Sequence, residues 1–313
     1  MSSISKIIKT ANDIKAINIQ GATNIAKAAI EILGNEIKKN KFGSIQEFNK
    51  FFSQATTLLK EARETEPMLF NGLKYCQSEY KKLLKQKLSL NKIQNRLNKA
   101  CNYYLNEIIE EEKIRPLIGS KLIKKGCNIM THCHSGSVVN ILTTAHKQGK
   151  QIHVYNTETR PLYQGRKTSN DLIKAGVPDT MITDDAAPFF VDNLYESHID
   201  IDMVIIGSDA IKLNGNVYNK IGSFSISMAA RHSGIPIYIV GSLLKVDTAD
   251  KVKIEIRDGK ELRSDAPKGL EIINYAFDMV PEKFITGIIT EFGIIKPKDL
   301  KKAVKKHYPR MLK

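Results

Sequence analysis

Five short apolar runs, each separated from the next by a helical or polar segment, constrain the fold of this chain more than any other feature of its sequence. They span residues 127–131, 152–156, 180–184, 203–208 and 235–241, and each has the length of a strand buried in a parallel sheet. Helical patterns such as SGSVVNILTTAHKQG and GRKTSNDLIKAG lie between them. This order predicts a Rossmann-like α/β domain over residues 119–313, with a mostly parallel sheet and helices on both faces.

Two further segments of this region follow other patterns. In VKIEIRDGKELRS, two alternating runs flank Asp258-Gly259, and this arrangement predicts a tight β-hairpin. The final segment, KPKDLKKAVKKHYPRMLK, is predicted to form a basic helix or tail.

Residues 1–118 have helical spacing and are predicted to form a separate helical domain. Ser44 and Glu47 make a capping box at the start of one helix. Its apolar stripe is Ile45, Phe48, Phe52, Ala55, Leu59 and Ala62. A second long helix carries the apolar face Ile93, Leu97, Cys101, Tyr104 and Ile108. Between the two, Glu66-Pro67 predicts a break, because the residue before a proline disfavours helix.

The formal net charge of +15 raises the question of a nucleic-acid partner. Most of the excess is lysine scattered along helical segments, which is typical of solvated surfaces. The chain contains no Trp, and no basic stretch is interleaved with aromatic residues on which bases stack. We therefore expect no nucleic-acid partner, whereas an anionic small substrate is compatible with the charge.

The four cysteines form no CxxC pair, which favours free thiols in a reducing cytoplasm over a disulfide framework. The first twenty residues contain no continuous apolar block before a small-residue cleavage site, and no apolar run approaches the length that crosses a bilayer. We therefore expect a cytoplasmic protein with neither a secretory signal nor a membrane partner.

Polar and ionisable residues follow every predicted strand. Because ligands bind beyond the carboxyl ends of parallel strands, we expect these segments to converge on one crevice. The turn 135–137 opens a helix whose amides attract phosphate, although such a turn is also common as a simple cap. Residues 219–223 repeat the arrangement, and Arg160 and Lys245 add positive charge at other strand ends. Two anion cradles and several cations predict a substrate with more than one phosphate.

Cys133 lies beside the first of these helix starts, where the helix dipole is expected to favour the thiolate and lower the pKa of the cysteine. Asp209 follows a hydrophobic strand and the small pair Gly207-Ser208, so burial is expected to raise its pKa. Such a pair, placed across a sugar carbon, moves protons by general acid–base catalysis. A helix or turn cap is the alternative role for Asp209.

His132 and His134 flank Cys133 in MTHCHSGS and raise the question of a metal site. In an extended segment the histidines project to one face and the cysteine to the other, and a zinc site needs a further strong ligand. We therefore expect no metal here and two loop histidines satisfied by the backbone. Tuning of the thiol or phosphate binding is the alternative for either. No G-x-G-x-x-G follows the first strand, which argues against a dinucleotide.

An ordered set of motifs carries a family resemblance over nearly the whole chain. The motifs are THCHSGS, ETRPLYQGRKTSNDL, ITDDAAPFF, GSDAIKLNGNVYNKIGS and FDMVPEKFITGIITEFGIIKP. The chain resembles a superfamily of archaeal ribose-1,5-bisphosphate isomerases, methylthioribose-1-phosphate isomerases and regulatory subunits of the exchange factor for translation initiation factor two. The resemblance implies that Cys133 and Asp209 are the catalytic pair of an isomerase. Thr-His-Cys and Asp209-Ala210 are more similar to the ribose-bisphosphate branch than to the methylthioribose branch.

The resemblance also implies a set of residues that bind the sugar and its phosphates. They are Arg63, Ser135, Gly136, Ser137, Gln164, Asn219, Lys220 and Lys245. At Gln20, Gly21 and Ala22 the family pattern has Arg-Gly-Ala, so the phosphate contact expected there loses its charge and is weakened. The segment RETEP also departs from the R-P-T pattern of the isomerases.

The function implied by the resemblance is conversion of ribose 1,5-bisphosphate to ribulose 1,5-bisphosphate through an enol-like intermediate, without a metal or redox cofactor. AMP-stimulated activity in nucleotide salvage and a homodimer or homohexamer built through the carboxy-terminal domain are implied as well. The alternative is a regulatory subunit of translation initiation that senses a sugar phosphate or nucleotide in the same crevice without turnover.

Overall fold

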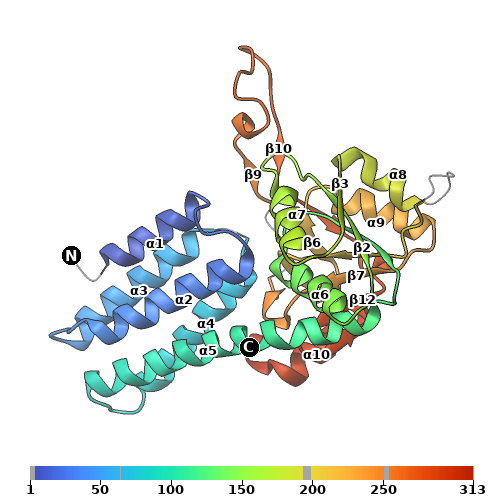
Figure 1. The fold of residues 1–313 in the computed structure, drawn as a ribbon. Helices are drawn as coiled ribbons and strands as arrows, with labels where there is room; N and C mark the ends of the chain where they lie inside the picture. The colour runs from blue at the N-terminus through green and yellow to red at the C-terminus, as the bar shows by residue number, and fades with distance from the viewer. Residues whose placement is uncertain (1–3, 64, 193–198, 250–253, 313) are drawn as a thin grey trace. The chain divides into compact units, whose positions relative to one another are not determined.

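The computed structural model describes residues 4–63, 65–192, 199–249 and 254–312, and Figure 1 shows their fold. The chain forms two compact units, which comprise residues 1–110 and residues 111–312. The helix α5 (Leu90–Gly119) begins in unit 1 and ends in unit 2. No helix among the described residues combines the length and the apolar character that crossing a membrane requires.

Unit 1 consists of helices. They are α1 (Ser5–Lys15), α2 (Ala22–Lys39), α3 (Ile45–Glu61), α4 (Pro67–Leu84) and the first part of α5. The predicted capping box is confirmed, because Ser44 Oγ accepts the amide of Glu47 at 3.1 Å and Glu47 Oε2 accepts the amide of Gly43 at 2.7 Å. Both predicted stripes face the core of unit 1, with Ile45 half-buried and the others buried. The break before Pro67 is also confirmed.

The core of unit 2 is a seven-stranded sheet with the order β13-β12-β7-β4-β1-β2-β3. Its strands are β1 (Asn128–Thr131), β2 (His153–Thr157), β3 (Asp179–Ile182), β4 (Met203–Ile206), β7 (Ile237–Val240), β12 (Gly287–Thr290) and β13 (Gly293–Ile295). Every neighbouring pair is parallel except β12 and β13. The five apolar runs therefore form five parallel strands, as predicted.

Helices cover both faces of this sheet (Figure 1). They are α6 (Gly136–Lys147), α7 (Gln164–Lys174), α8 (Ala187–Asp192), α9 (Ser223–His232) and α10 (Leu300–His307), the last of which is the predicted C-terminal helix. Right-handed crossovers place α6 and α7 on one face and α8 and α9 on the other. The predicted fold class is thus confirmed. The strand order reverses between β1 and β4, and sheets of this type bind ligands at such a reversal.

A second sheet of four strands lies at the carboxyl end of β4. Its order is β11-β6-β5-β8, from β5 (Ala210–Lys212), β6 (Val217–Lys220), β8 (Val246–Asp247) and β11 (Phe277–Val280). Asp209 directly precedes β5, Lys220 ends β6, and Lys245 directly precedes β8. This small sheet was not predicted, yet four of the proposed site residues lie in its strands or directly before them: Asp209, Asn219, Lys220 and Lys245.

The predicted hairpin around Asp258-Gly259 is wrong. Asp258 instead caps a 3-10 turn (Gly259–Glu261), accepting the amide of Lys260 at 2.9 Å. The strand β9 (Ile256–Arg257) pairs antiparallel with β10 (Asn274–Tyr275), so a long loop separates the two strands. Figure 1 shows this arm extending away from the sheets. Residues 251–253, at the start of the predicted hairpin, lie outside the described residues.

Candidate active site

Cys133 follows β1 with an unusual backbone conformation. Its φ angle is 66°, in the left-handed region that non-glycine residues rarely adopt. Two threonines hold this conformation, because the amide of Cys133 donates to Thr159 Oγ1 at 3.0 Å and its carbonyl accepts from Thr168 Oγ1 at 2.9 Å. Strain of this kind persists only where surrounding contacts enforce it, and it is common in active sites. The position of the half-buried thiol is therefore fixed by the loop after β2 and by α7.

The pKa of Cys133 differs from the prediction. Burial, with a smaller contribution from the charge of Asp209, raises the pKa of the thiol to about 12. The ammonium of Lys220 and the amide of His134 act in the opposite direction but do not compensate. The predicted lowering by the α6 dipole is thus wrong, because removal of water from the thiolate outweighs the charges that favour it. The thiol is protonated at neutral pH.

Asp209 lies on the small sheet beside the thiol. It is half-buried, and its amide donates to the carbonyl of Tyr218 at 3.0 Å across β5 and β6. The end of β4 approaches the turn before α6 so closely that a Cβ at Gly207 would lie 2.9 Å from the Cβ of Ser135. Only glycine permits this approach. The carboxyl ends of β1 and β4 therefore meet, as predicted.

Two buried lysines reach the same place. The ammonium of Lys220 lies 5.3 Å from the centre of the Phe277 ring, and its charge acts on Cys133. Lys245 donates to the carbonyl of Ser208 at 2.7 Å, one residue before Asp209. Asn219 is buried and donates to Ser223 Oγ at 2.8 Å. The site thus combines a thiol, a carboxylate and two cations, which suits a phosphorylated substrate.

The second predicted anion cradle is occupied by a side chain of the protein. Asp278 Oδ2, on β11, accepts the amides of Gly222 at 2.7 Å and Phe224 at 3.0 Å. Burial raises the pKa of Asp278 to about 6, and the two amides oppose this rise. Two amides at the N-terminus of α9 are therefore satisfied by a carboxylate of the protein, and the binding of a substrate anion there remains a prediction.

The turn before α6 makes two kinds of contact, a helix cap and a contact with a buried arginine. Ser135 is the N-cap of the helix and its hydroxyl accepts the amide of Val138 at 3.4 Å, which is the simple capping role. Gly136 is exposed, and Ser137 Oγ lies 3.4 Å from Nη2 of Arg115. The turn is thus held from beneath by a buried guanidinium.

Gln164 opens α7 and carries a buried Oε1 atom with no hydrogen-bond partner in the described part of the chain. The backbone is tightly packed here, since a Cβ at Gly165 would lie 1.7 Å from the carbonyl oxygen of Thr157. A buried acceptor without a donor is costly in a folded protein. A hydroxyl group of a ligand is a suitable donor for it.

His132 and His134 are both held by hydrogen bonds, and a backbone partner, as predicted, is seen for His132. The buried His132 contacts Thr157 Oγ1 at 2.6 Å through Nδ1 and the carbonyl of Ile221 at 2.8 Å through Nε2. Nδ1 of His134 lies 3.1 Å from Thr168 Oγ1. Within the described ranges, no three His, Cys, Asp or Glu side chains gather in a way that could hold a metal ion.

Asp184 and the threonines around Cys133 were missed in the sequence. Asp184 accepts the amides of Thr159 at 2.7 Å and Arg160 at 2.6 Å, which fixes the loop that holds Cys133. The predicted cation Arg160 is exposed, and its guanidinium donates to the Tyr163 hydroxyl and, at 3.3 Å, to the Leu262 carbonyl. The sequence signal for Asp184 was its place after a strand, in TDDAAP.

The remaining predicted residues belong to unit 1. Gly21 has a φ angle of 83° and caps α2, which begins at the buried Ala22, while Gln20 is exposed. Arg63 is mostly buried, with Nε 3.7 Å from Glu66 Oε1. Their part in substrate binding remains a prediction.

Comparison with known proteins gives consistent relatives. The chain matches the initiation factor 2 subunit family over residues 18–297. Ribose 1,5-bisphosphate isomerase from Thermococcus kodakarensis is 32% identical over 306 residues, covering 95% of this chain and 93% of the relative. The protein of the same name from Pyrococcus furiosus is 34% identical over 304 residues, covering 94% and 91%.

Relatives with other substrates in their names match as well. The 5-deoxyribose 1-phosphate isomerase of Petrotoga mobilis is 33% identical over 300 residues, covering 90% of this chain and 84% of the relative. The crystal structure of 5-methylthioribose 1-phosphate isomerase from Pyrococcus horikoshii OT3 superposes with a TM-score of 0.78 at 29% identity, covering 97% of this chain and 88% of that chain. The resemblance carried by the motifs is confirmed, and the chain belongs to the initiation factor 2 subunit family.

Proposed function

We propose that this protein is an aldose–ketose isomerase that converts ribose 1,5-bisphosphate to ribulose 1,5-bisphosphate. The observation that carries the proposal is the meeting of Cys133 and Asp209 beside two buried lysines at the reversal of strand order. The relatives named as ribose 1,5-bisphosphate isomerases, which match nearly end to end, support the substrate.

The reaction moves two hydrogens and needs one base and one acid. The thiol proton of Cys133 first passes to Asp209, which gives a thiolate and a carboxylic acid. Asp209 then gives this proton to the ring oxygen as the bond from C1 to that oxygen breaks, and the Cys133 thiolate removes the proton from C2, so that an enol joins C1 and C2. Cys133 then returns its proton to C1, and Asp209 takes the proton of the C2 hydroxyl, which becomes the ketone. Both residues end in the protonation states that the first transfer produced, a thiolate and a carboxylic acid.

The raised pKa of Cys133 fits this division of roles. A thiol with a pKa of about 12 is a poor base on its own, and the nearby charge of Asp209 is one cause of the rise. Transfer of the thiol proton to Asp209 removes that charge and produces the thiolate base and the carboxylic acid together. Lys220 stabilises the thiolate after the transfer.

Turnover of three sugar phosphates tests the proposal. We expect ribose 1,5-bisphosphate to exceed 5-deoxyribose 1-phosphate and 5-methylthioribose 1-phosphate in kcat/KM by about 100-fold, because roughly 3 kcal/mol of contacts to the second phosphate are lost. Cys133→Ser should lower kcat by about 10²–10⁴, the usual contribution of a general base. Cys127→Ser, at a buried cysteine of unit 2, is the matched control and should leave kcat unchanged.

The contrary outcomes are distinct. Equal turnover of all three sugars would reject the bisphosphate substrate but not the isomerase. Turnover of none by the wild type would reject the isomerase in favour of a sensing subunit of translation initiation, which a pull-down on initiation factor two then examines.

We further propose a homodimer or homohexamer assembled through the carboxy-terminal domain and stimulated by AMP, on the family resemblance alone. Sedimentation velocity with and without AMP, followed by turnover in the same buffers, tests both points. A monomer, or a rate that AMP does not change, would contradict them.

A further inference from the structure

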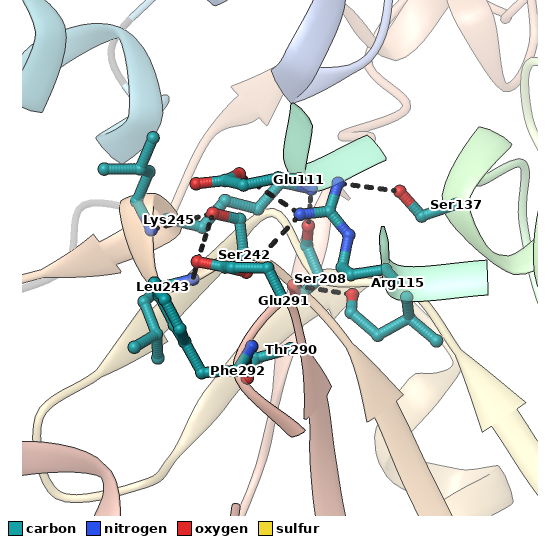
Figure 2. A network of polar contacts seen from close by, with 12 residues as sticks. Glu111, Arg115, Ser137, Ser208, Ser242, Leu243, Lys245, Thr290, Glu291 and Phe292 are labelled. Atoms are coloured by element: carbon teal, nitrogen blue, oxygen red, sulfur yellow. Dashed lines mark hydrogen bonds and ion pairs between the residues drawn. The ribbon is translucent and has the colours of Figure 1, made fainter. Parts of the chain in front are cut away.

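A buried ionic cluster lies within unit 2 and is not part of the chemistry described above. Arg115, near the end of α5, is 1% exposed, and its Nη1 lies 3.2 Å from Glu111 Oε2 and 3.6 Å from Glu291 Oε2 (Figure 2). Glu111 and Glu291 are also almost fully buried. Buried ion pairs add little net stability, because desolvation of the charges offsets their attraction. A role beyond stability is therefore worth seeking.

One side of the cluster supports the turn before α6. The second guanidinium nitrogen of Arg115, Nη2, lies 3.4 Å from Ser137 Oγ. Ser137 is in the first turn of α6, directly after the exposed Gly136. The guanidinium is planar and rigid, so the pairs to the two glutamates fix the direction in which Nη2 points. Arg115 thereby fixes the hydroxyl of Ser137.

The other side of the cluster supports the segment that carries Lys245. Glu291 Oε1 accepts from Ser242 Oγ at 3.3 Å and from the amide of Leu243 at 3.2 Å, at the start of the 3-10 turn Leu243–Lys245. Lys245 ends this turn and reaches the carbonyl of Ser208 (Figure 2). One cluster thus contacts the segments after both β1 and β7.

The cluster carries no net negative charge at neutral pH. Burial, with the charge of Glu291, raises the pKa of Glu111 to about 8, although Arg115 and hydrogen bonds from Ser242 and Tyr308 oppose the rise. Glu111 is then protonated, so at most one carboxylate faces the guanidinium, that of Glu291, whose pKa burial raises and Arg115 lowers. The cluster can therefore fix both segments without repelling an anion held between them.

We propose that Arg115 and Glu291 are positioning residues that set Ser137 and Lys245 at the spacing a phosphate group of the substrate requires. The expectation of a phosphate here comes from the family resemblance, and the identity of the substrate rests on the proposed function. Neither residue touches the reacting atoms. Their loss should weaken phosphate binding and raise KM while kcat changes little, whereas a merely structural defect lowers the active fraction and hence kcat.

Substitutions that remove the charges of Arg115 and Glu291 together test the proposal without leaving one charge of the cluster unpaired. Arg115→Met alone leaves Glu291 as an unpaired buried charge, so the main variant is Arg115→Met with Glu291→Gln. We expect this double variant to bind inorganic phosphate about tenfold more weakly in titration calorimetry, as when a hydrogen bond to a charged group is lost. KM for the sugar phosphate should rise in parallel. Glu36→Gln, at a buried carboxyl of unit 1 that pairs with Lys6 at 3.3 Å, is the control for general loss of an ion pair.

A second comparison tests whether Arg115 acts through Ser137. If it does, adding Ser137→Ala to the double variant changes phosphate affinity less than twofold, although Ser137→Ala alone weakens it about fivefold. If the loss of phosphate affinity in the triple variant equals the product of the losses in Ser137→Ala and in the double variant, the proposal is overturned. Arg115→Lys supplies the measurement if the double variant does not fold, because it keeps the charge and loses the fork. An unchanged phosphate affinity in Arg115→Lys would also overturn it.

The result is separable from the proposed function. If the wild type turns over no sugar phosphate but its phosphate affinity still depends on Arg115, the isomerase fails and the positioning role stands. If the wild type is active while the double variant keeps the phosphate affinity and KM of the wild type, the positioning role fails and the isomerase stands.

Discussion

Replacement of Asp278 by Asn tests the assignment of its carboxylate to the start of α9. Asp278 Oδ2 accepts two amides, whereas its Oδ1 is buried without a partner among the described residues. A buried carboxylate satisfied on one oxygen only is costly, and a proton on the other oxygen relieves that cost. Asn keeps an oxygen for the two amides and removes the charge.

The magnitude follows from the shift in pKa. The pKa of Asp278 rises from its ordinary 3.8 to about 6 in the folded protein, and a difference of roughly 2 units corresponds to about 3 kcal/mol. Between about pH 4 and pH 6 the folded state binds more protons than the unfolded state, so the free energy of unfolding falls as pH rises through this window. Above pH 6 the contribution no longer changes.

Urea unfolding followed by circular dichroism at pH 4.5 and pH 7.5 measures the effect. We expect the free energy of unfolding of the wild type to fall by about 2 kcal/mol relative to that of Asp278→Asn between pH 4.5 and pH 7.5. At pH 7.5 the variant should be no less stable than the wild type. Asp13→Asn is a control of opposite sign, because the hydrogen bond from Lys9 lowers the pKa of Asp13. If wild type and Asp278→Asn show the same pH dependence, the carboxylate does not occupy the cradle as described.

Iodoacetamide should alkylate Cys133 slowly at pH 7.5 and faster toward pH 10, because its thiol has a pKa of about 12. Mass spectrometry measures the rates, and rapid alkylation at neutral pH would refute the protonated thiol. Gly165→Ala should lower the free energy of unfolding by at least about 3 kcal/mol, since the new methyl group overlaps the Thr157 carbonyl. Urea unfolding decides this, and a neutral effect would contradict the close packing. Gln20→Arg should lower KM for ribose 1,5-bisphosphate about fivefold at constant kcat, because a charged donor binds phosphate more tightly. An unchanged KM would show that residue 20 does not bind the phosphate.

The strands were predictable because each lies in a short, mainly apolar run, and those in the middle of the sheet are buried on both faces. Met203–Ile206, for example, is buried at all four positions. A strand of a parallel sheet that is covered on both faces buries four consecutive apolar residues in this way. The small sheet was not predictable in the same way. Its strands Ala210–Lys212 and Val217–Lys220 are short and mix polar with apolar residues, and they are defined by pairing with β8 and β11, which lie far along the chain.

In the site, too, the features with a local sequence signal could be predicted, and those that depend on distant segments could not. Cys133 and its turn could be placed from the sequence, because they follow a recognisable strand. The direction of the Cys133 pKa shift could not be, because it depends on burial by segments distant in sequence. Asp278 was missed for a related reason, since its place at α9 arises from the register that pairs it with Asn219 across β11 and β6. Residue type and spacing therefore indicated the chemistry of the site. They could not indicate that pairing between distant strands places the Asp278 carboxylate at the start of α9.

The β5–β6 hairpin has a mechanical consequence for the acid and the cation. Asp209 and Lys220 lie at the open end of this hairpin, one just before β5 and the other at the end of β6. The hydrogen bond from the Asp209 amide to the Tyr218 carbonyl joins the two strands there. Cys133 belongs to the large sheet. Any displacement of the small sheet against the large one would carry Asp209 and Lys220 as one body. The separation of acid from thiol is therefore the adjustable distance in this site, while the separation of acid from cation stays constant.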